Sequence, residues 1–178
     1  MKKILFLALF AFMLIGCRSS NGPLDTDGKG RFLLMLANSS HVIINESDIE
    51  MYEIMQMYEG IPDIFAHWIR LNDVGSERLR SYATWNEDFT PPIAKSISII
   101  GKEFSIIFRG KKLYKGIFVC APSKMYESYT VDLAFVVKHL PCTLVLETVP
   151  NNTSLVDRKD EDELFAYFDS IGKLKRIE

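Results

Sequence analysis

The chain has 178 residues, of which 48% are hydrophobic and 25% are charged. This size and composition suit one globular domain with a core of ordinary size. The formal net charge is −2. This slight acidic excess argues against nucleic acid as a partner, because nucleic acid usually selects a strongly basic face.

The beginning of the chain has the pattern of an export signal. Lys2 and Lys3 precede an apolar run from Ile4 to Ile15. This run of about a dozen residues is shorter than the roughly 20 that a membrane-spanning helix needs. A basic start, a short apolar segment and small residues at its end are typical of a cleaved secretory signal.

The apolar run closes with Leu14, Ile15, Gly16 and Cys17. This tetrapeptide resembles the lipobox of bacterial lipoproteins, where the signal peptide is cleaved. The resemblance implies that residues 1–16 are removed and that Cys17 carries a diacylglyceryl group and an acyl chain such as palmitate. Several acyl chains together anchor a protein stably. Arg18 stands where an aspartate would favour the inner membrane, which implies an outer-membrane lipoprotein facing the periplasm.

The expected mature chain divides into a tether and a domain. Loss of Lys2 and Lys3 leaves 19 basic residues against 23 acidic ones, a net charge of −4. Residues 17–29 follow as small, polar and turn-prone residues, which predict a flexible tether. Residues 30–178 are expected to form a single globular domain.

Strands and amphipathic helices are expected in the first half of this domain. Residues 31–37 and 41–45 are short apolar runs that predict strands. Ser47 and Glu50 form a capping box, and the residues after them predict a helix that Gly60 ends. The apolar face of this helix consists of Met51, Ile54, Met55 and Tyr58.

Two further helices are predicted before residue 91. Pro62 suits the first turn of one, and its apolar face comprises Ile64, Phe65, Trp68 and Leu71. Ser76 is expected to cap the other, with Leu79 facing inward. Pro91 and Pro92 then stop helical structure.

Between residues 93 and 121, apolar residues recur at every second position, as they do in strands. Glycines at 101 and 110 separate three alternating runs, which predict a three-stranded antiparallel meander. Residues 128–140 suit a strand by their β-branched content and a helix by their apolar stripe, and we favour a helix. Residues 142–149 predict another strand.

A last helix is expected over about 160–171. Acidic residues at its start and basic residues after its end match the helix dipole. Its buried stripe is expected to consist of Leu164, Phe165, Phe168 and Ile171. The whole pattern predicts an α+β fold in which the meander and further strands pack with several amphipathic helices.

Two cysteines remain besides Cys17. Cys120 and Cys142 either pair in a disulfide, which an oxidising compartment permits, or remain free thiols. A helical crossover over 128–140 would make the adjoining strands parallel and hold the two cysteines too far apart to pair. An antiparallel return would bring them together.

The sequence contains no recognisable catalytic or metal-binding motif. His41, His67 and His139 match no metal-ligand spacing, and neither a nucleophile elbow nor a phosphate-binding loop is present. A Cys120–His139 nucleophile pair is conceivable, but a structural role for both residues is favoured. No cofactor and no metal are expected.

The best candidate for partner recognition is the stretch from residue 85 to residue 89. Trp85 and Phe89 flank the acidic pair Glu87 and Asp88 in a segment between predicted elements. Tryptophan is enriched at interface hot spots. Core packing of these aromatic residues is the competing interpretation.

These observations favour a lipid-anchored, non-catalytic binding protein of the periplasm. An immunity or inhibitor role against a toxin or hydrolase is the preferred form, since an acidic surface suits a basic protein partner. Two alternatives stay open. One is an accessory lipoprotein for envelope assembly, and the other is a small envelope hydrolase with an unrecognised site.

Overall fold

Strands dominate the structure, a computed structural model that describes residues 32–56, 65–120, 129–133, 136–147 and 156–177. Within these ranges there are two α-helices, α1 (Asp73–Arg80) and α2 (Arg158–Ser170), and one 3-10 turn, η1 (Glu46–Asp48). The strands are β1 (Phe32–Leu36), β2 (Val42–Asn45), β3 (Ile49–Gln56), β4 (Phe65–Leu71), β5 (Ala83–Asn86), β6 (Ile93–Ile97), β7 (Glu103–Phe108), β8 (Lys111–Val119), β9 (Tyr129–Asp132), β10 (Thr143–Glu147) and β11 (Leu174–Ile177).

Nine strands form one sheet in the order β11-β3-β4-β10-β9-β8-β7-β1-β2. The β11–β3 and β8–β9 pairs are parallel, and the other neighbours are antiparallel. The sheet is curled, because the rings of Phe32 on β1 and Tyr52 on β3 meet with centroids 6.1 Å apart although five strands separate them in the sheet. The concave side holds the core.

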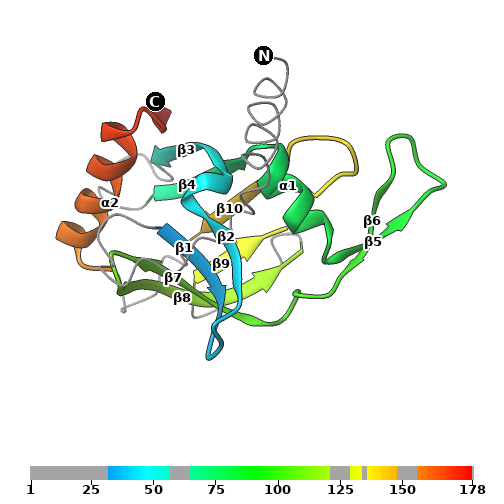
Figure 1. Cartoon of the computed structure of the whole chain (residues 1–178), viewed down its shortest axis with the longest axis horizontal. Helices are drawn as coiled ribbons and strands as arrows, with labels where there is room; N and C mark the ends of the chain where they lie inside the picture. Colours follow the sequence, from blue (N-terminus) through cyan, green and yellow to red (C-terminus); the bar gives the residue numbers. More distant parts are fainter. Residues whose placement is uncertain (1–31, 57–64, 121–128, 134–135, 148–155, 178) are drawn as a thin grey trace, which may run out of the picture.

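Helix α2 covers one side of this core (Figure 1). Its buried residues include Phe165 and Phe168, and the Phe168 ring stacks on Tyr52 at 4.5 Å. Asp157 caps the helix by accepting a hydrogen bond from the Lys159 amide. Helix α1 packs elsewhere, against β2, η1 and β4.

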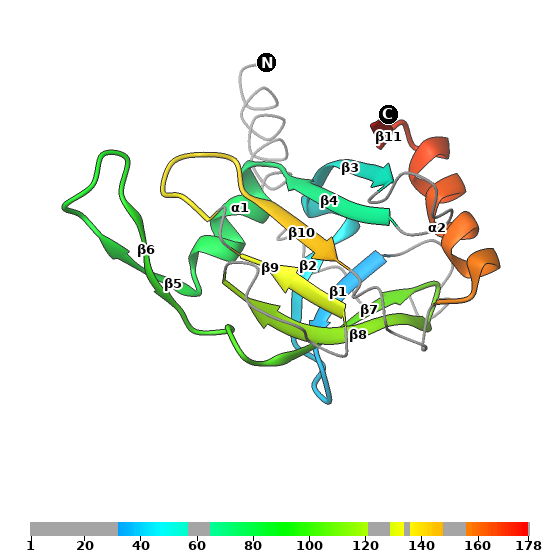
Figure 2. The ribbon, with the colours of Figure 1, turned by 180° about the vertical axis from the view of Figure 1, so that it is seen from behind.

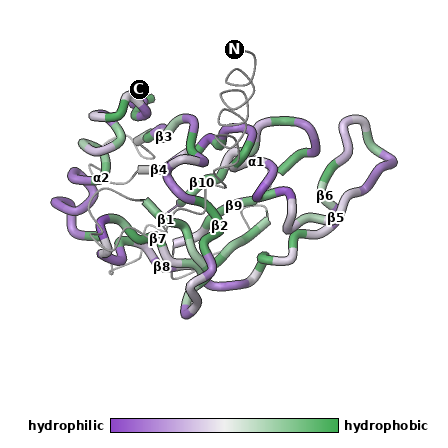
Figure 3. Tube along the Cα trace, in the orientation of Figure 1, coloured by the Kyte–Doolittle hydropathy of each residue, from purple (hydrophilic) through white to green (hydrophobic). Residues whose placement is uncertain are grey.

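Strands β5 and β6 form a separate two-stranded sheet. This hairpin projects away from the main body, at the end of the molecule opposite α2, in both views (Figures 1 and 2). Hydrophilic residues occupy its far end, whereas strands of the main sheet carry hydrophobic stretches (Figure 3). No helix in the described ranges is long and apolar enough to cross a membrane.

The α+β prediction with several amphipathic helices is wrong. The two segments predicted as the first helices, from Ser47 and from Pro62, contain β3 and β4 instead. A capping box does exist, but it joins Asn45 to Asp48 in η1, and the chain is extended from Ile49 onward. Strands β3 and β4 pair along their whole length, and this long-range pairing overrides the helical spacing of the apolar residues.

Two further predictions are wrong because long-range strand pairing again overrides the local sequence pattern. The favoured helix over 128–140 is wrong, because β9 lies there between β8 and β10 and all four of its residues are buried. The three-stranded meander over 93–121 is also wrong: β7 and β8 pair, but β6 pairs with β5 in the hairpin. The expected third helix begins earlier, at Asp73 after the cap Asn72.

The remaining elements agree with the sequence pattern. Strands β1, β2 and β10 lie at the three places predicted for them. The last helix is confirmed as α2, with Leu164, Phe165 and Phe168 buried. Ile171, expected in the same stripe, is 42% exposed, because the helix ends one residue before it. The expected signal and tether, residues 1–29, lie outside the described residues.

Candidate functional site

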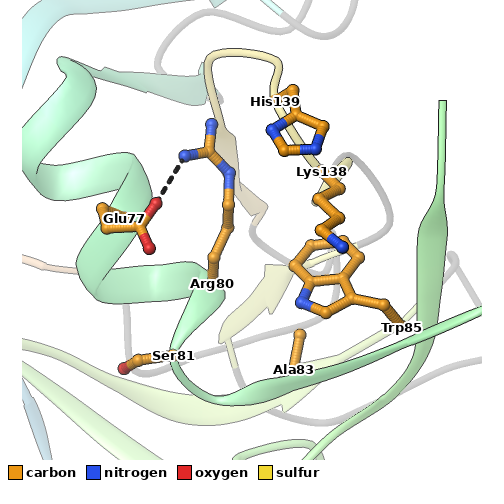
Figure 4. Close-up of a pocket in the computed structure, with 7 residues that line it drawn as sticks. All are labelled: Glu77, Arg80, Ser81, Ala83, Trp85, Lys138 and His139. Carbon is orange, nitrogen blue, oxygen red and sulfur yellow. Dashed lines mark hydrogen bonds and ion pairs between the residues drawn. The ribbon is translucent and has the colours of Figure 1, made fainter.

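A pocket of about 340 Å³ lies where α1, the β5–β6 hairpin and the turn before β10 meet. Its walls combine charged, polar and aromatic side chains, and those of Arg80, Lys138, His139 and Trp85 surround a common space (Figure 4). The lining residues are Glu77, Arg80, Ser81, Ala83, Trp85, Lys138 and His139. We refer to these seven residues as the hairpin pocket.

Arg80 provides one wall of the hairpin pocket from the last turn of α1. The Asn72 side chain accepts a hydrogen bond from the Gly75 amide at 2.9 Å and so sets where this helix begins. The Arg80 guanidinium donates to Glu77 at 3.1 Å and to the Leu140 carbonyl. Its Nε is buried and has no hydrogen-bond partner.

Lys138 and His139 provide the opposite wall from the turn before β10. The Lys138 amide donates to the Pro92 carbonyl at 3.0 Å, which ties this turn to the hairpin. The Lys138 Nζ lies 2.6 Å from a carboxylate oxygen of Glu87. His139 has a φ of 67°, a left-handed conformation that is uncommon outside glycine and places the ring at the pocket (Figure 4).

Of the four residues predicted for partner recognition, one lines the hairpin pocket and three are exposed to solvent. Trp85 lies on β5 and is partly buried at the hairpin pocket. Glu87, Asp88 and Phe89 lie in the exposed connection of the hairpin, and Phe89 is 50% exposed. Sequence reasoning missed Arg80 and Lys138, since the fold brings them together from distant segments.

Six large hydrophobic residues of the described chain are exposed, and two of them, Phe89 and Ile93, belong to the hairpin and its connection. The others are Val74 in α1, Ile100 before β7, Leu140 before β10 and Ile171 after α2. Single exposed apolar residues are normal on a protein surface, so only the pair on the projecting hairpin is a candidate contact surface.

A second polar cluster is buried beneath α2. The Tyr52 hydroxyl lies 2.7 Å from Nδ1 of His67, and Nε2 of His67 lies 3.4 Å from Glu161. The Tyr114 hydroxyl donates to the same Glu161 oxygen at 2.7 Å. Burial alone would raise the pKa of Glu161, but hydrogen bonds from His67 and Tyr114 outweigh it and lower the pKa. His67 is 3% exposed, so this cluster holds the core together.

Cys120 and Cys142 are both free thiols. Strand β9 separates the strands that adjoin Cys120 and Cys142, which places them about 9 Å or more apart at the usual strand spacing, too far for a disulfide. Cys142 is buried, and burial raises the pKa of its thiol. Cys120 lines a different, apolar groove of about 610 Å³, so it is not brought to His139.

Within the described ranges, no group of three or more His, Cys, Asp or Glu side chains could hold a metal ion. Comparison with models of known protein families, with curated proteins and with solved structures finds no match to this chain.

Proposed function

We propose that the chain is a lipid-anchored, non-catalytic binding protein of a bacterial envelope, positioned on the outer membrane and facing the periplasm. The observation that carries this proposal is the sequence Leu14-Ile15-Gly16-Cys17 after a short apolar run. Acylation of Cys17 would place the domain near the membrane on the polar segment that follows.

The surface that meets the partner is the hairpin end of the molecule. Phe89 and Ile93 are exposed on the hairpin and its connection, and the acidic residues Glu87 and Asp88 lie beside them. A projecting hairpin with exposed aromatic and charged side chains suits protein recognition, because aromatic residues are enriched in protein interfaces.

Within this class we favour an immunity or inhibitor role against a toxin or hydrolase that reaches the periplasm. The net charge of −4 expected for the mature chain supports it, because an acidic protein attracts a basic partner and speeds their association.

Fatty-acid labelling tests the anchoring. Cells that express the full chain are grown with an alkyne analogue of palmitate, and the purified protein is then examined for the label. We expect the wild-type chain and the Cys120→Ser variant to be labelled, and the Cys17→Ala variant to be unlabelled and to keep its signal peptide. A labelled Cys17→Ala chain, or an unlabelled wild-type chain, would contradict the proposal.

A further inference from the structure

The hairpin pocket has the charge and the shape of a site for a small acid. We propose that it binds a carboxylate carried on an apolar carbon skeleton, with the carboxylate between Arg80 and Lys138 and the skeleton against Trp85. This inference goes beyond the proposed function, since it concerns a ligand and holds whether or not Cys17 is acylated.

The charges of the pocket favour a monoanion. Its lining contains the two cations Arg80 and Lys138 and one carboxylate, Glu77, and Glu87, outside the lining, contacts Lys138. These four charges cancel, so a ligand that takes the place of one glutamate is balanced when it carries a single negative charge. A phosphate monoester carries about −1.5 to −2 at pH 7 and would be less well balanced here. A carboxylate carries a single charge.

Arg80 is the stronger of the two candidate anion-binding side chains, although its two terminal nitrogens contact Glu77 and the Leu140 carbonyl. Its Nε is buried without a hydrogen-bond partner, and an unpaired buried donor costs about 1–3 kcal/mol. The planar fork of arginine matches the two oxygens of a carboxylate. A ligand carboxylate would take the place of Glu77 at Nη1 of Arg80, since Nη2 donates to the Leu140 carbonyl.

The rest of the lining suits an apolar skeleton of modest size. The indole of Trp85 and the methyl group of Ala83 lie on the hairpin side of the pocket (Figure 4). The volume of about 340 Å³ lies at the lower end of the range for small-molecule sites, roughly 300–1,000 Å³.

Two carboxylates of the protein itself form ion pairs with Arg80 and Lys138. Glu77 contacts Arg80 and Glu87 contacts Lys138, but their side chains are 79% and 62% exposed. Such solvated ion pairs contribute only about 0–1 kcal/mol. A ligand therefore replaces them at little loss, and removal of Glu87 should strengthen binding.

The two tryptophans of the chain give a direct test. The full chain, labelled with 5-fluorotryptophan and held in micelles of a non-ionic detergent, has two fluorine resonances, which a Trp68→Phe variant assigns. N-acetylphenylalanine is titrated in, with N-acetylphenylalaninamide as the neutral control of the same shape. We expect the acid to shift the Trp85 resonance saturably, and the amide to leave it in place.

Three variants test whether the ligand carboxylate binds next to Lys138. Lys138→Gln should weaken binding of the acid, and Glu87→Gln should strengthen it, each by about two- to five-fold if the ion pairs have the usual strength. Lys112→Gln, an exposed lysine at the start of β8, should leave the affinity unchanged. An unshifted Trp68 resonance reports that each variant is folded.

Two further probes identify the source of the ligand. A pentapeptide that ends in phenylalanine with a free carboxylate should bind more tightly than N-acetylphenylalanine if the ligand is a peptide C-terminus, and no more tightly if it is a free acid. Phenyl phosphate should bind more weakly than either acid. The proposal is overturned if the amide shifts Trp85 as much as the acid does, if no acid shifts it, or if phenyl phosphate binds best.

Discussion

Glu161 lies at the centre of the polar contacts between α2 and the sheet. It accepts a hydrogen bond from Tyr114 and lies beside His67, and it is 9% exposed. Its lowered pKa means that the ionised carboxylate is more favourable in the folded chain than in the unfolded one. The carboxylate therefore stabilises the fold at neutral pH.

Glu161→Gln should lower the free energy of unfolding at pH 7 by about 1–3 kcal/mol, the usual range for a hydrogen bond to a charged group. The unfolded value of a glutamate pKa is about 4.3, and the folded value lies below it. The stabilisation is thus complete above about pH 5 and is lost as the pH falls through the folded pKa. Chemical denaturation of both chains between pH 7 and pH 3 measures the difference.

Glu163→Gln on the same helix is the matched control. Glu163 is 47% exposed and lies 3.7 Å from Arg109, so its replacement should change stability by less than about 1 kcal/mol. If the free energies of unfolding of wild type and Glu161→Gln differ by the same amount from pH 7 to pH 3, the charge of Glu161 does not stabilise the fold.

At the scale of elements, the parallel β8–β9 pair depends on a glycine. Gly116 on β8 lies opposite Tyr129, and a Cβ at this glycine would come 1.8 Å from the Tyr129 carbonyl oxygen. The nearest atoms belong to backbone, so a side chain cannot be accommodated without moving β9. Close approach of two backbones is a common reason for glycine inside a strand.

Gly116→Ala should therefore destabilise the chain by about 3 kcal/mol or more, beyond the usual cost of a single substitution. Thermal unfolding followed by circular dichroism measures it. Lys115→Ala, at the exposed neighbouring position, should lower the midpoint by no more than a few degrees, as expected for about 0.5 kcal/mol. Equal effects of the two substitutions would refute the tight β8–β9 contact.

The elements that the sequence predicts correctly are those whose pattern is local. Strand β1 is a compact apolar run, and α2 carries its own stripe of Leu164, Phe165 and Phe168. Strand β3 was not predictable in this way, because Met51, Ile54 and Met55 fit a helix equally well. In β4, burial of His67, Ile69 and Leu71 alternates with partial exposure of the residues between them. This period of two was concealed in the sequence by the helical spacing of the apolar residues.

The candidate site was predictable only in part, for the same reason. Trp85 and the acidic pair stand together in the sequence and also lie at the pocket or beside it. Arg80 and Lys138 come from an α1 terminus and from the turn before β10. They line the same pocket only because the chain runs through β9 before it reaches Lys138. The sequence pattern predicted a helix in place of β9.

At the scale of the whole molecule, the α2 end and the hairpin end differ in structure and in proposed role. The α2 end is closed by buried aromatic rings, such as the Tyr52–Phe168 stack. The hairpin end carries the pocket and the exposed residues Phe89 and Ile93. We infer that α2 holds the curled sheet together, and that the hairpin end is the surface offered to a partner.

Photo-cross-linking in the cells that produce the protein tests this account most directly. A benzoylphenylalanine is introduced at Phe89 on the hairpin connection or at Ile171 after α2, two exposed apolar positions on opposite ends of the molecule. The account predicts a discrete adduct with another protein from position 89 and none from position 171. The same adducts from both positions, or an adduct from position 171 alone, would contradict it.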